Sequence, residues 1–244
     1  MRLTDFEVVS FGCYGTLVDR DSGIHAALRP LLESGQITLG REEVLAAFNR
    51  HEAAQQVETP RMPYSDLLAQ VHRHLAGEWG VLASDDDHAL FGQSVPQWPV
   101  FVDTPAALQY LKRYFRLVVL SNVDGASFAG SSRRLEVRFD DVVTAEEIGS
   151  YKPALGNFRR LVSRVAKLGF ERHQILHVAQ SVARDLMPAG TCGLATAWIE
   201  RGPEAAVENA MVEEGEPSAA AVRYEFRFAS LVDMVRAHQE ELRA

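Results

Sequence analysis

A long helical stretch interrupts an otherwise regular alternation of strands and helices in this chain. Residues 6–11 (FEVVSF) are β-branched and aromatic and run into a glycine-containing segment, which is typical of a strand that enters a loop. Residues 20–95 then carry apolar side chains at helical spacing. Beyond this stretch, helices alternate with short apolar strands, predicted at residues 116–122, 140–145, 174–179, 194–200 and 224–228.

This alternation predicts an α/β fold, because strands that alternate with helices form a parallel sheet with helices on both faces. We expect a Rossmann-like core domain made of residues 1–19 and 97–244. Residues 20–96 are then a helical cap domain, inserted after the first strand. Ligands of open parallel sheets bind at the carboxyl ends of the strands, so the cap is expected to cover the site.

Several helix ends can be predicted from local residue types. Ser22 is expected to cap the first cap helix, and Gly35 to end it. Ser84, followed by three aspartates, predicts another helix start, and Pro153 is expected to open a helix in the core. Residues 213–221 (EEGEPSAAA) predict a surface loop.

The bulk composition excludes several classes of protein. A formal net charge of −8 disfavours a general binder of nucleic acid or of membrane surfaces, since both need a basic face. The two cysteines, Cys13 and Cys192, are too few for a disulfide framework. The first residues lack the pattern of a secretory signal, so we predict a cytoplasmic protein.

Short polar segments follow the predicted strands. Because the carboxyl ends of parallel strands meet at one edge, these loops are expected to converge on a small pocket with one fixed positive charge. Such a pocket suits an anionic substrate or a developing negative charge. The segments are Gly12–Leu17, Ser121–Asn122, Lys152–Pro153, and Gln180–Ser181 with Asp185.

In order and spacing, the segments FGCYGTLVD, LSN, YKP and QSVARD resemble the haloacid dehalogenase superfamily. The chain most resembles the branch of type II (S)-2-haloacid dehalogenases, and the resemblance covers essentially the whole chain. It implies a hydrolase that attacks the α-carbon of a small 2-substituted carboxylate and forms a covalent aspartyl ester. The expected partner is therefore a small carboxylate substrate.

Gly12 occupies the position at which the resemblance implies the nucleophilic aspartate. Glycine has no side chain, so the covalent step lacks its nucleophile, and we expect the chain to be inactive or nearly so. Cys13 follows directly, but successive residues leaving a strand point to opposite sides, and a small buried thiol is the simpler interpretation.

The resemblance also implies that no metal and no cofactor are needed. Phosphatases of the superfamily hold Mg²⁺ through carboxylates at the positions of Gly12 and Gln180, and place an acid at the position of Tyr14. None of these three residues is a carboxylate here, and a hard dication wants several anionic oxygens. A sugar- or nucleotide-phosphate phosphatase is therefore disfavoured.

The remaining roles are those that the resemblance implies. Thr16 and Ser121 are expected to hydrogen-bond the nucleophile or the substrate carboxylate, and Lys152 to keep the attacking carboxylate ionised. Asp185 is expected to pair with Lys152 and to position the hydrolytic water. Further contacts with the substrate are expected from Cys13, Tyr14, Asn122, Gln180, Ser181 and, from the cap, Arg50, with Arg41 and Arg61 as alternatives.

Aromatic and histidine side chains leave interpretations open. Tyr64, Trp98 and Phe101 are expected either to line an apolar pocket between cap and sheet or to pack these two parts together. Four histidines are interpreted as structural or solvated: His51, His72, His74 and His177.

Two other functions compete with an inactivated dehalogenase. One is a ring-opening hydrolase of the azetidine-2-carboxylate type, which also attacks a carbon beside a carboxylate. The other is a non-catalytic pseudoenzyme that binds a small carboxylate or a protein partner. Relatives of this kind often form dimers, and the apolar faces of the cap helices are compatible with a homodimer.

Overall fold

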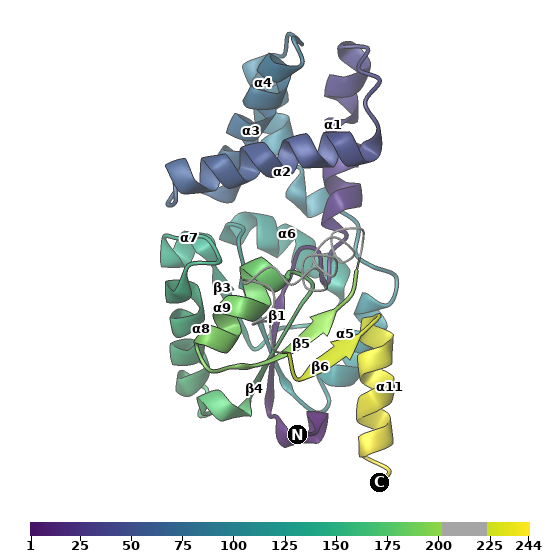
Figure 1. The fold of residues 1–244 in the computed structure, drawn as a ribbon, viewed down its shortest axis with the longest axis vertical. Helices are drawn as coiled ribbons and strands as arrows, with labels where there is room; N and C mark the ends of the chain where they lie inside the picture. Colours follow the sequence, from purple (N-terminus) through teal and green to yellow (C-terminus); the bar gives the residue numbers. More distant parts are fainter. Residues whose placement is uncertain (202–223) are drawn as a thin grey trace, which may run out of the picture.

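A computed structural model describes residues 1–201 and 224–244 of the chain. Its centre is a sheet of six parallel strands in the order β3-β2-β1-β4-β5-β6 (Figure 1). This confirms the predicted parallel α/β fold. The loop predicted at residues 213–221 lies outside the described residues. The strands are β1 (Val8–Gly12), β2 (Arg116–Ser121), β3 (Asp141–Thr144), β4 (Ile175–Ala179), β5 (Ala195–Ile199) and β6 (Phe226–Phe228).

Strand β1 lies in the middle of the sheet, between β2 and β4. The chain runs outward from β1 to β2 and β3, and then crosses to β4 on the other side of β1. The direction of winding reverses at this point, and open parallel sheets form a ligand-binding crevice there. The carboxyl end of β1 is Gly12, which is in register with Leu120 of β2.

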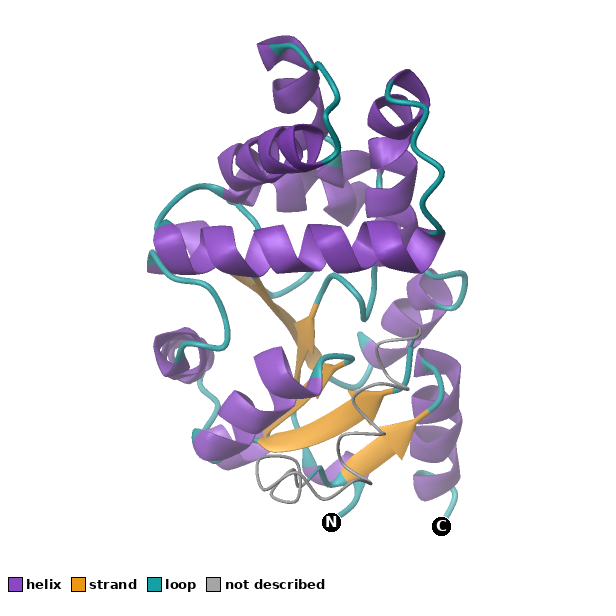
Figure 2. Cartoon of the chain, turned by 45° about the horizontal axis from the view of Figure 1, so that its top comes forward, coloured by secondary structure: helices purple, strands orange, loops and turns teal. Residues whose placement is uncertain are grey.

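Four helices follow β1 and lie over the carboxyl end of the sheet (Figures 1 and 2). Asp19, and not the predicted Ser22, caps the first of them, because its side chain accepts a hydrogen bond from the backbone of Ser22. Ser84 caps the fourth, as predicted. We call α1–α4 the cap helices: α1 (Arg20–Ser34), α2 (Arg41–Glu58), α3 (Tyr64–Glu78) and α4 (Asp85–Gly92).

The other helices flank the sheet. The helix predicted to open at Pro153 begins two residues later, at Leu155. The helix predicted after β4 is split into a π-helical turn, Val182–Leu186, and a short α-helix. The flanking helices are α5 (Thr104–Leu111), α6 (Gly125–Leu135), α7 (Ala145–Ile148), α8 (Leu155–Lys167), α9 (Met187–Thr191) and α11 (Leu231–Glu241).

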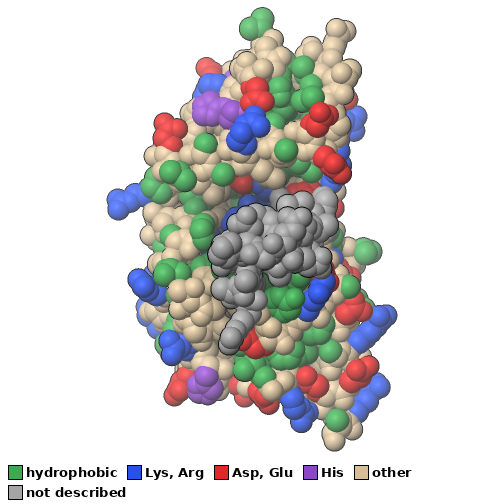
Figure 3. Space-filling view, viewed as in Figure 1, with side chains coloured by type: hydrophobic (Ala, Val, Ile, Leu, Met, Phe, Trp, Pro, Cys, Tyr) green, Lys and Arg blue, Asp and Glu red, His purple; other side chains and the backbone are tan. Residues whose placement is uncertain are grey.

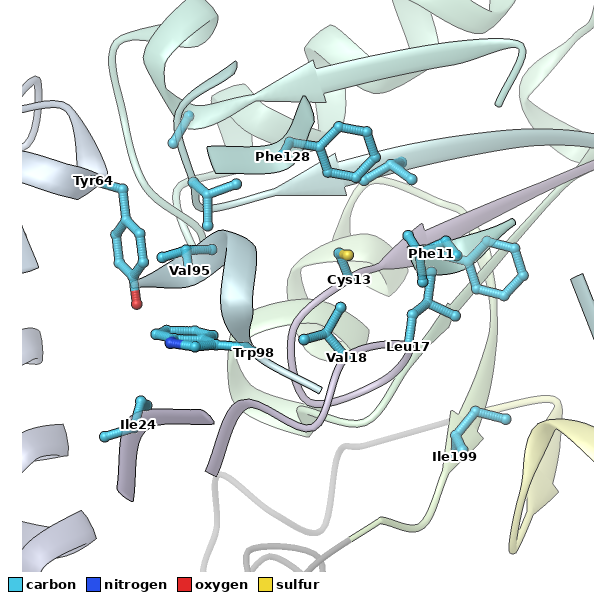
Figure 4. Packing of buried hydrophobic residues seen from close by; sticks show 14 of the residues in the cluster. Phe11, Cys13, Leu17, Val18, Ile24, Tyr64, Val95, Trp98, Phe128 and Ile199 are labelled. Atoms are coloured by element: carbon cyan, nitrogen blue, oxygen red, sulfur yellow. The ribbon is translucent and has the colours of Figure 1, made fainter. Parts of the chain in front are cut away.

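One hydrophobic cluster joins the cap helices to the sheet. Trp98 lies between cap residues Tyr64 and Ile24 on one side and Val18 of the first loop on the other (Figure 4). Gly23 of α1 makes this packing close, because a Cβ there would be 2.3 Å from Cγ of Trp98. Burying these aromatic surfaces on both sides stabilises the cap helices against the sheet.

Charged side chains of both signs are interspersed over the face of the molecule shown in Figure 3. Among the helices that the structure describes, none combines an apolar sequence with the length needed to span a membrane.

Candidate active site

A small polar cavity of about 40 Å³ lies where the loops after β1, β2 and β4 meet the cap helices. A cavity of this size admits only a small ligand. The structure brings together most of the predicted residues here, since Cys13, Tyr14, Ser121, Asn122, Lys152, Ser181 and Asp185 all line it.

Gly12 ends β1 directly beside the Asp185 carboxylate. A Cβ built on Gly12 would be 2.9 Å from Oδ1 of Asp185 and 3.1 Å from Cβ of Ala179, at the end of β4. The side chain missing from position 12 would therefore point toward the acidic group of the pocket.

Lys152 and Asp185 form a buried ion pair. Nζ of Lys152 donates to Oδ1 of Asp185 at 2.5 Å and to the carbonyl oxygen of Leu120 at 3.0 Å. Burial alone would raise the pKa of the Asp185 carboxyl, but the Lys152 charge and a hydrogen bond from His177 lower it to about 2. Asp185 is therefore ionised at neutral pH.

His177 is a site residue that the sequence interpretation missed. It lies in β4, fully buried, with Nε2 3.1 Å from Oδ1 of Asp185 and Nδ1 2.9 Å from Oγ of Ser10. Burial lowers the pKa of His177 in spite of the adjacent carboxylate, so the ring is neutral at neutral pH. A neutral ring beside an ionised carboxylate carries its proton on Nε2 and accepts from Ser10.

Ser121 and Asn122 leave β2 side by side but have different surroundings. Oγ of Ser121 is buried and has no hydrogen-bond partner among the described residues, so it can bind a polar ligand atom. The Asn122 amide instead accepts from the backbone N–H of Lys152 at 2.7 Å and donates to its carbonyl at 3.2 Å. Asn122 therefore holds Lys152 in place.

Thr16 and Gln180 join the first loop to the loop after β4. Oγ1 of Thr16 accepts from the backbone N–H of Gln180 at 2.8 Å, and neither residue lines the cavity. The Gln180 carbonyl accepts from the indole of Trp198 at 2.8 Å. The geometry gives both residues a role in holding these loops together. Ser181 does line the cavity, and its Oγ caps the π-helical turn by accepting from the backbone of Arg184.

Cys13 and Tyr14 are buried and uncharged. Burial raises the pKa of the Cys13 thiol to about 12, so it is not a thiolate at neutral pH. The Tyr14 hydroxyl lies 2.8 Å from Oγ of Ser131, and its ring packs edge-on against Trp98. Burial also raises the pKa of Tyr14, so both residues are neutral side chains in the wall of the cavity.

The cap contributes a buried charged cluster that the sequence interpretation did not identify. Oε2 of Glu52 accepts from Arg20 at 2.7 Å, and Oε1 accepts from the Tyr64 hydroxyl at 2.5 Å. Arg184, from the core, lies 3.7 Å from the same carboxylate. Burial would raise the pKa of Glu52, but the two guanidiniums outweigh it and hold the pKa below its usual value. All four residues line the cavity.

The structure does not bring Arg50 to the cavity. Its guanidinium is exposed and pairs with Glu78 at 2.6 Å. The alternative Arg41 donates to Ser22 at an exposed position, and neither Arg41 nor Arg61 lines the cavity. The basic cap residue at the site is instead Arg20. Of the three aromatic residues left open, Tyr64 lines the cavity and Trp98 packs cap against core.

In the described ranges, no group of three or more His, Cys, Asp or Glu side chains is placed to ligate a metal ion. Around the cavity, the carboxylates belong to Asp185 and Glu52, and each is paired with a cation.

The sheet order and the four helices between the first and second strands match the fold of solved L-2-haloacid dehalogenases. No model of a known protein family matches the chain, and no curated protein matches it in sequence.

Solved structures show which proteins share this fold. A defluorinating L-2-haloacid dehalogenase has 18% identity and a TM-score of 0.78, over 100% of this chain and 99% of that chain. Another L-2-haloacid dehalogenase has 21% identity and a TM-score of 0.76, over 95% of this chain and 98% of that chain. The L-2-haloacid dehalogenase from Xanthobacter autotrophicus with chloropropionic acid covalently bound has 17% identity and a TM-score of 0.74, over 96% of this chain and 98% of that chain.

Proposed function

We propose that this chain carries the site of a hydrolase acting at the α-carbon of a small 2-substituted carboxylate, in which Gly12 has removed the attacking side chain. One observation carries the proposal. Lys152 pairs with Asp185, and position 12, directly beside that carboxylate, has no side chain. The small cavity and its buried Ser121 hydroxyl suit a short polar acid.

In the complete mechanism, a carboxylate at position 12 displaces the leaving group and forms an ester, which water then hydrolyses. Lys152 keeps that carboxylate ionised, and Ser121 donates to the nucleophile or to the substrate carboxylate. Without a carboxylate at position 12, we expect the chain still to bind its substrate. Turnover should be at least about 10³-fold slower than in a chain that has this carboxylate. The predicted homodimer and cytoplasmic location remain predictions.

Restoring the carboxylate tests the proposal. Gly12→Asp is assayed for halide release from L-2-chloropropionate and for ring opening of azetidine-2-carboxylate, with and without EDTA. The matched control is Gly12→Asn, which has the same shape but no charge. EDTA-resistant activity in Gly12→Asp that is at least about 10³-fold above that of Gly12→Asn and of the unchanged chain supports the proposal. The substrate that is turned over distinguishes a dehalogenase from a ring-opening hydrolase.

Two outcomes contradict the proposal. If the unchanged chain is as active as Gly12→Asp, the side chain at position 12 is not needed. If Gly12→Asp is inert on both acids while the unchanged chain binds them or a protein partner, a non-catalytic binding function is favoured instead.

A further inference from the structure

The Asp185 carboxylate lies within the space of the side chain that Gly12 lacks. A Cβ on Gly12 would be 2.9 Å from Oδ1 and 3.2 Å from Cγ of Asp185, both closer than ordinary van der Waals contact. Lys152, the expected partner of the attacking carboxylate, donates to that same Oδ1. Asp185 thus has the lysine partner of the lost aspartate and lies at the edge of its volume.

The two oxygens of Asp185 are in different situations. Lys152 and the Nε2–H of His177 both donate to Oδ1, at 2.5 and 3.1 Å. Among the hydrogen bonds of residues 1–201 and 224–244, none engages Oδ2, and Asp185 lines the cavity. Two fixed donors on one oxygen orient the carboxyl group and leave lone pairs of the other for an electrophile.

We propose that Asp185 is the nucleophile of this chain and supports slow hydrolysis of small 2-halocarboxylates without a side chain at position 12. The substrate class rests on the proposed function above. His177 is then a positioning residue, because it touches Asp185 and not the substrate. Ionisation of Asp185 at neutral pH, which its lowered pKa ensures, is required for this role.

The reaction balances in two steps. Oδ2 of Asp185 attacks the α-carbon, the carbon–halogen bond breaks, and halide leaves with the bonding electron pair. Water then attacks Cγ of the resulting Asp185 ester, and the bond between Cγ and the substrate-bound oxygen breaks. The departing alkoxide takes a proton from that water, which leaves a 2-hydroxycarboxylate, the ionised Asp185 and one proton in solvent.

Oxygen labelling tests this route directly. The unchanged protein, in excess over L-2-chloropropionate, is allowed a single turnover in H₂¹⁸O. We expect the lactate to carry no label and the peptide that contains Asp185 to gain one ¹⁸O, because the product oxygen comes from the carboxylate. Label in the first lactate, which marks direct attack by water, overturns the proposal.

Two variants add to the labelling result. Asp185→Asn is expected to abolish halide release, with its fold checked by circular dichroism. His177→Phe keeps a ring of similar size in β4 and is expected to lower kcat with little change in KM, because it loosens the nucleophile only. Halide release that persists in folded Asp185→Asn overturns the proposal.

Gly12→Asp, run in the same experiment, separates this inference from the proposed function. If Gly12→Asp releases halide and the unchanged chain releases none, the proposed function stands and the role of Asp185 as nucleophile is wrong. If neither protein releases halide, the substrate class is wrong, and the proposed function and the role of Asp185 as nucleophile are both overturned.

Discussion

Oδ1 of Asp185 is 2.9 Å from the point where a Cβ on Gly12 would be, so these two positions compete for one volume. Gly12 is fixed by pairing of β1 with β2, and Asp185 by Lys152 and His177. A side chain at position 12 must therefore turn the Asp185 carboxylate away from its present place. This competition makes the two positions energetically coupled.

The first prediction concerns Gly12→Ala. Overfilling a packed site typically costs about 1–3 kcal/mol of unfolding free energy, and here the added methyl group pushes the Asp185 carboxylate off Lys152. In an Asp185→Ala background the same change should cost less, with a coupling energy of about 0.5–3 kcal/mol. Urea unfolding of the four proteins measures it. Equal losses in both backgrounds would show that the positions do not share space.

A second prediction follows from the buried ion pair. Lys152→Met leaves the Asp185 carboxylate buried without its cation and should lower the unfolding free energy by about 3–5 kcal/mol. Adding Asp185→Asn removes the stranded charge and should restore part of that loss. Denaturant midpoints of both variants decide the matter. An identical loss in the single and the double variant would mean that the pair is not coupled.

The fold was predictable because each level of the sequence agrees with the others. Short apolar strands alternate with helices, and the helical block at residues 20–95 was expected to be an insertion after the first strand. The loops after β1, β2 and β4 converge as predicted, because parallel strands bring their carboxyl ends to one edge.

The prediction of which cap residue reaches the cavity was wrong, because it followed residue type and not position on the helix. Arg50 was chosen for its charge, but Glu52 is two residues away and faces the opposite side of α2. Val44, Phe48 and Glu52 recur every fourth residue and share the buried face. A carboxylate that continues an apolar stripe was the signal for a buried charged cluster.

His177 could not have been assigned from the sequence. It stands in an apolar strand, where a structural histidine is the ordinary interpretation. Its partner Asp185 lies in the π-helical turn, Val182–Leu186, which follows β4. That irregular turn has no distinct sequence signature, so only the three-dimensional structure shows the contact.

A third prediction concerns acid stability of the cap. Nδ1 of His72 is 2.8 Å from Nδ1 of His88, and burial, aided by the neighbouring imidazole, lowers the pKa of His72 from 6.5 to about 4. The unfolded chain therefore binds a proton between pH 6.5 and 4 that the folded chain resists. As the pH falls through this window, the contribution of His72 should lower the free energy of unfolding by up to about 1.4 kcal/mol per pH unit.

Urea unfolding at a series of pH values checks this. His72→Phe should flatten the loss between pH 6.5 and 4, whereas His74→Phe, at an exposed position of the same helix, should leave it unchanged. A parallel shift of the whole curve in His72→Phe, with its slope retained, would assign the titration to other groups.

The last prediction compares two residues of α2. Glu52→Gln keeps the shape of the side chain but removes the buried charge that Arg20 and Arg184 face, and should cost about 1–3 kcal/mol of unfolding free energy. Arg50→Ala breaks only an exposed pair with Glu78 and should cost less than about 1 kcal/mol. Unfolding in urea measures both.

The same two variants decide which cap charge acts on the ligand. Glu52 lines the cavity, so neutralising it removes repulsion from a bound carboxylate, and calorimetric titration with L-lactate should show tighter binding to Glu52→Gln whenever the variant is folded. Arg50→Ala should bind L-lactate as the unchanged chain does. If Arg50→Ala weakens binding and Glu52→Gln does not change it, the cap must move far enough to bring Arg50 to the site, and the arrangement around Arg20 is not the one that binds.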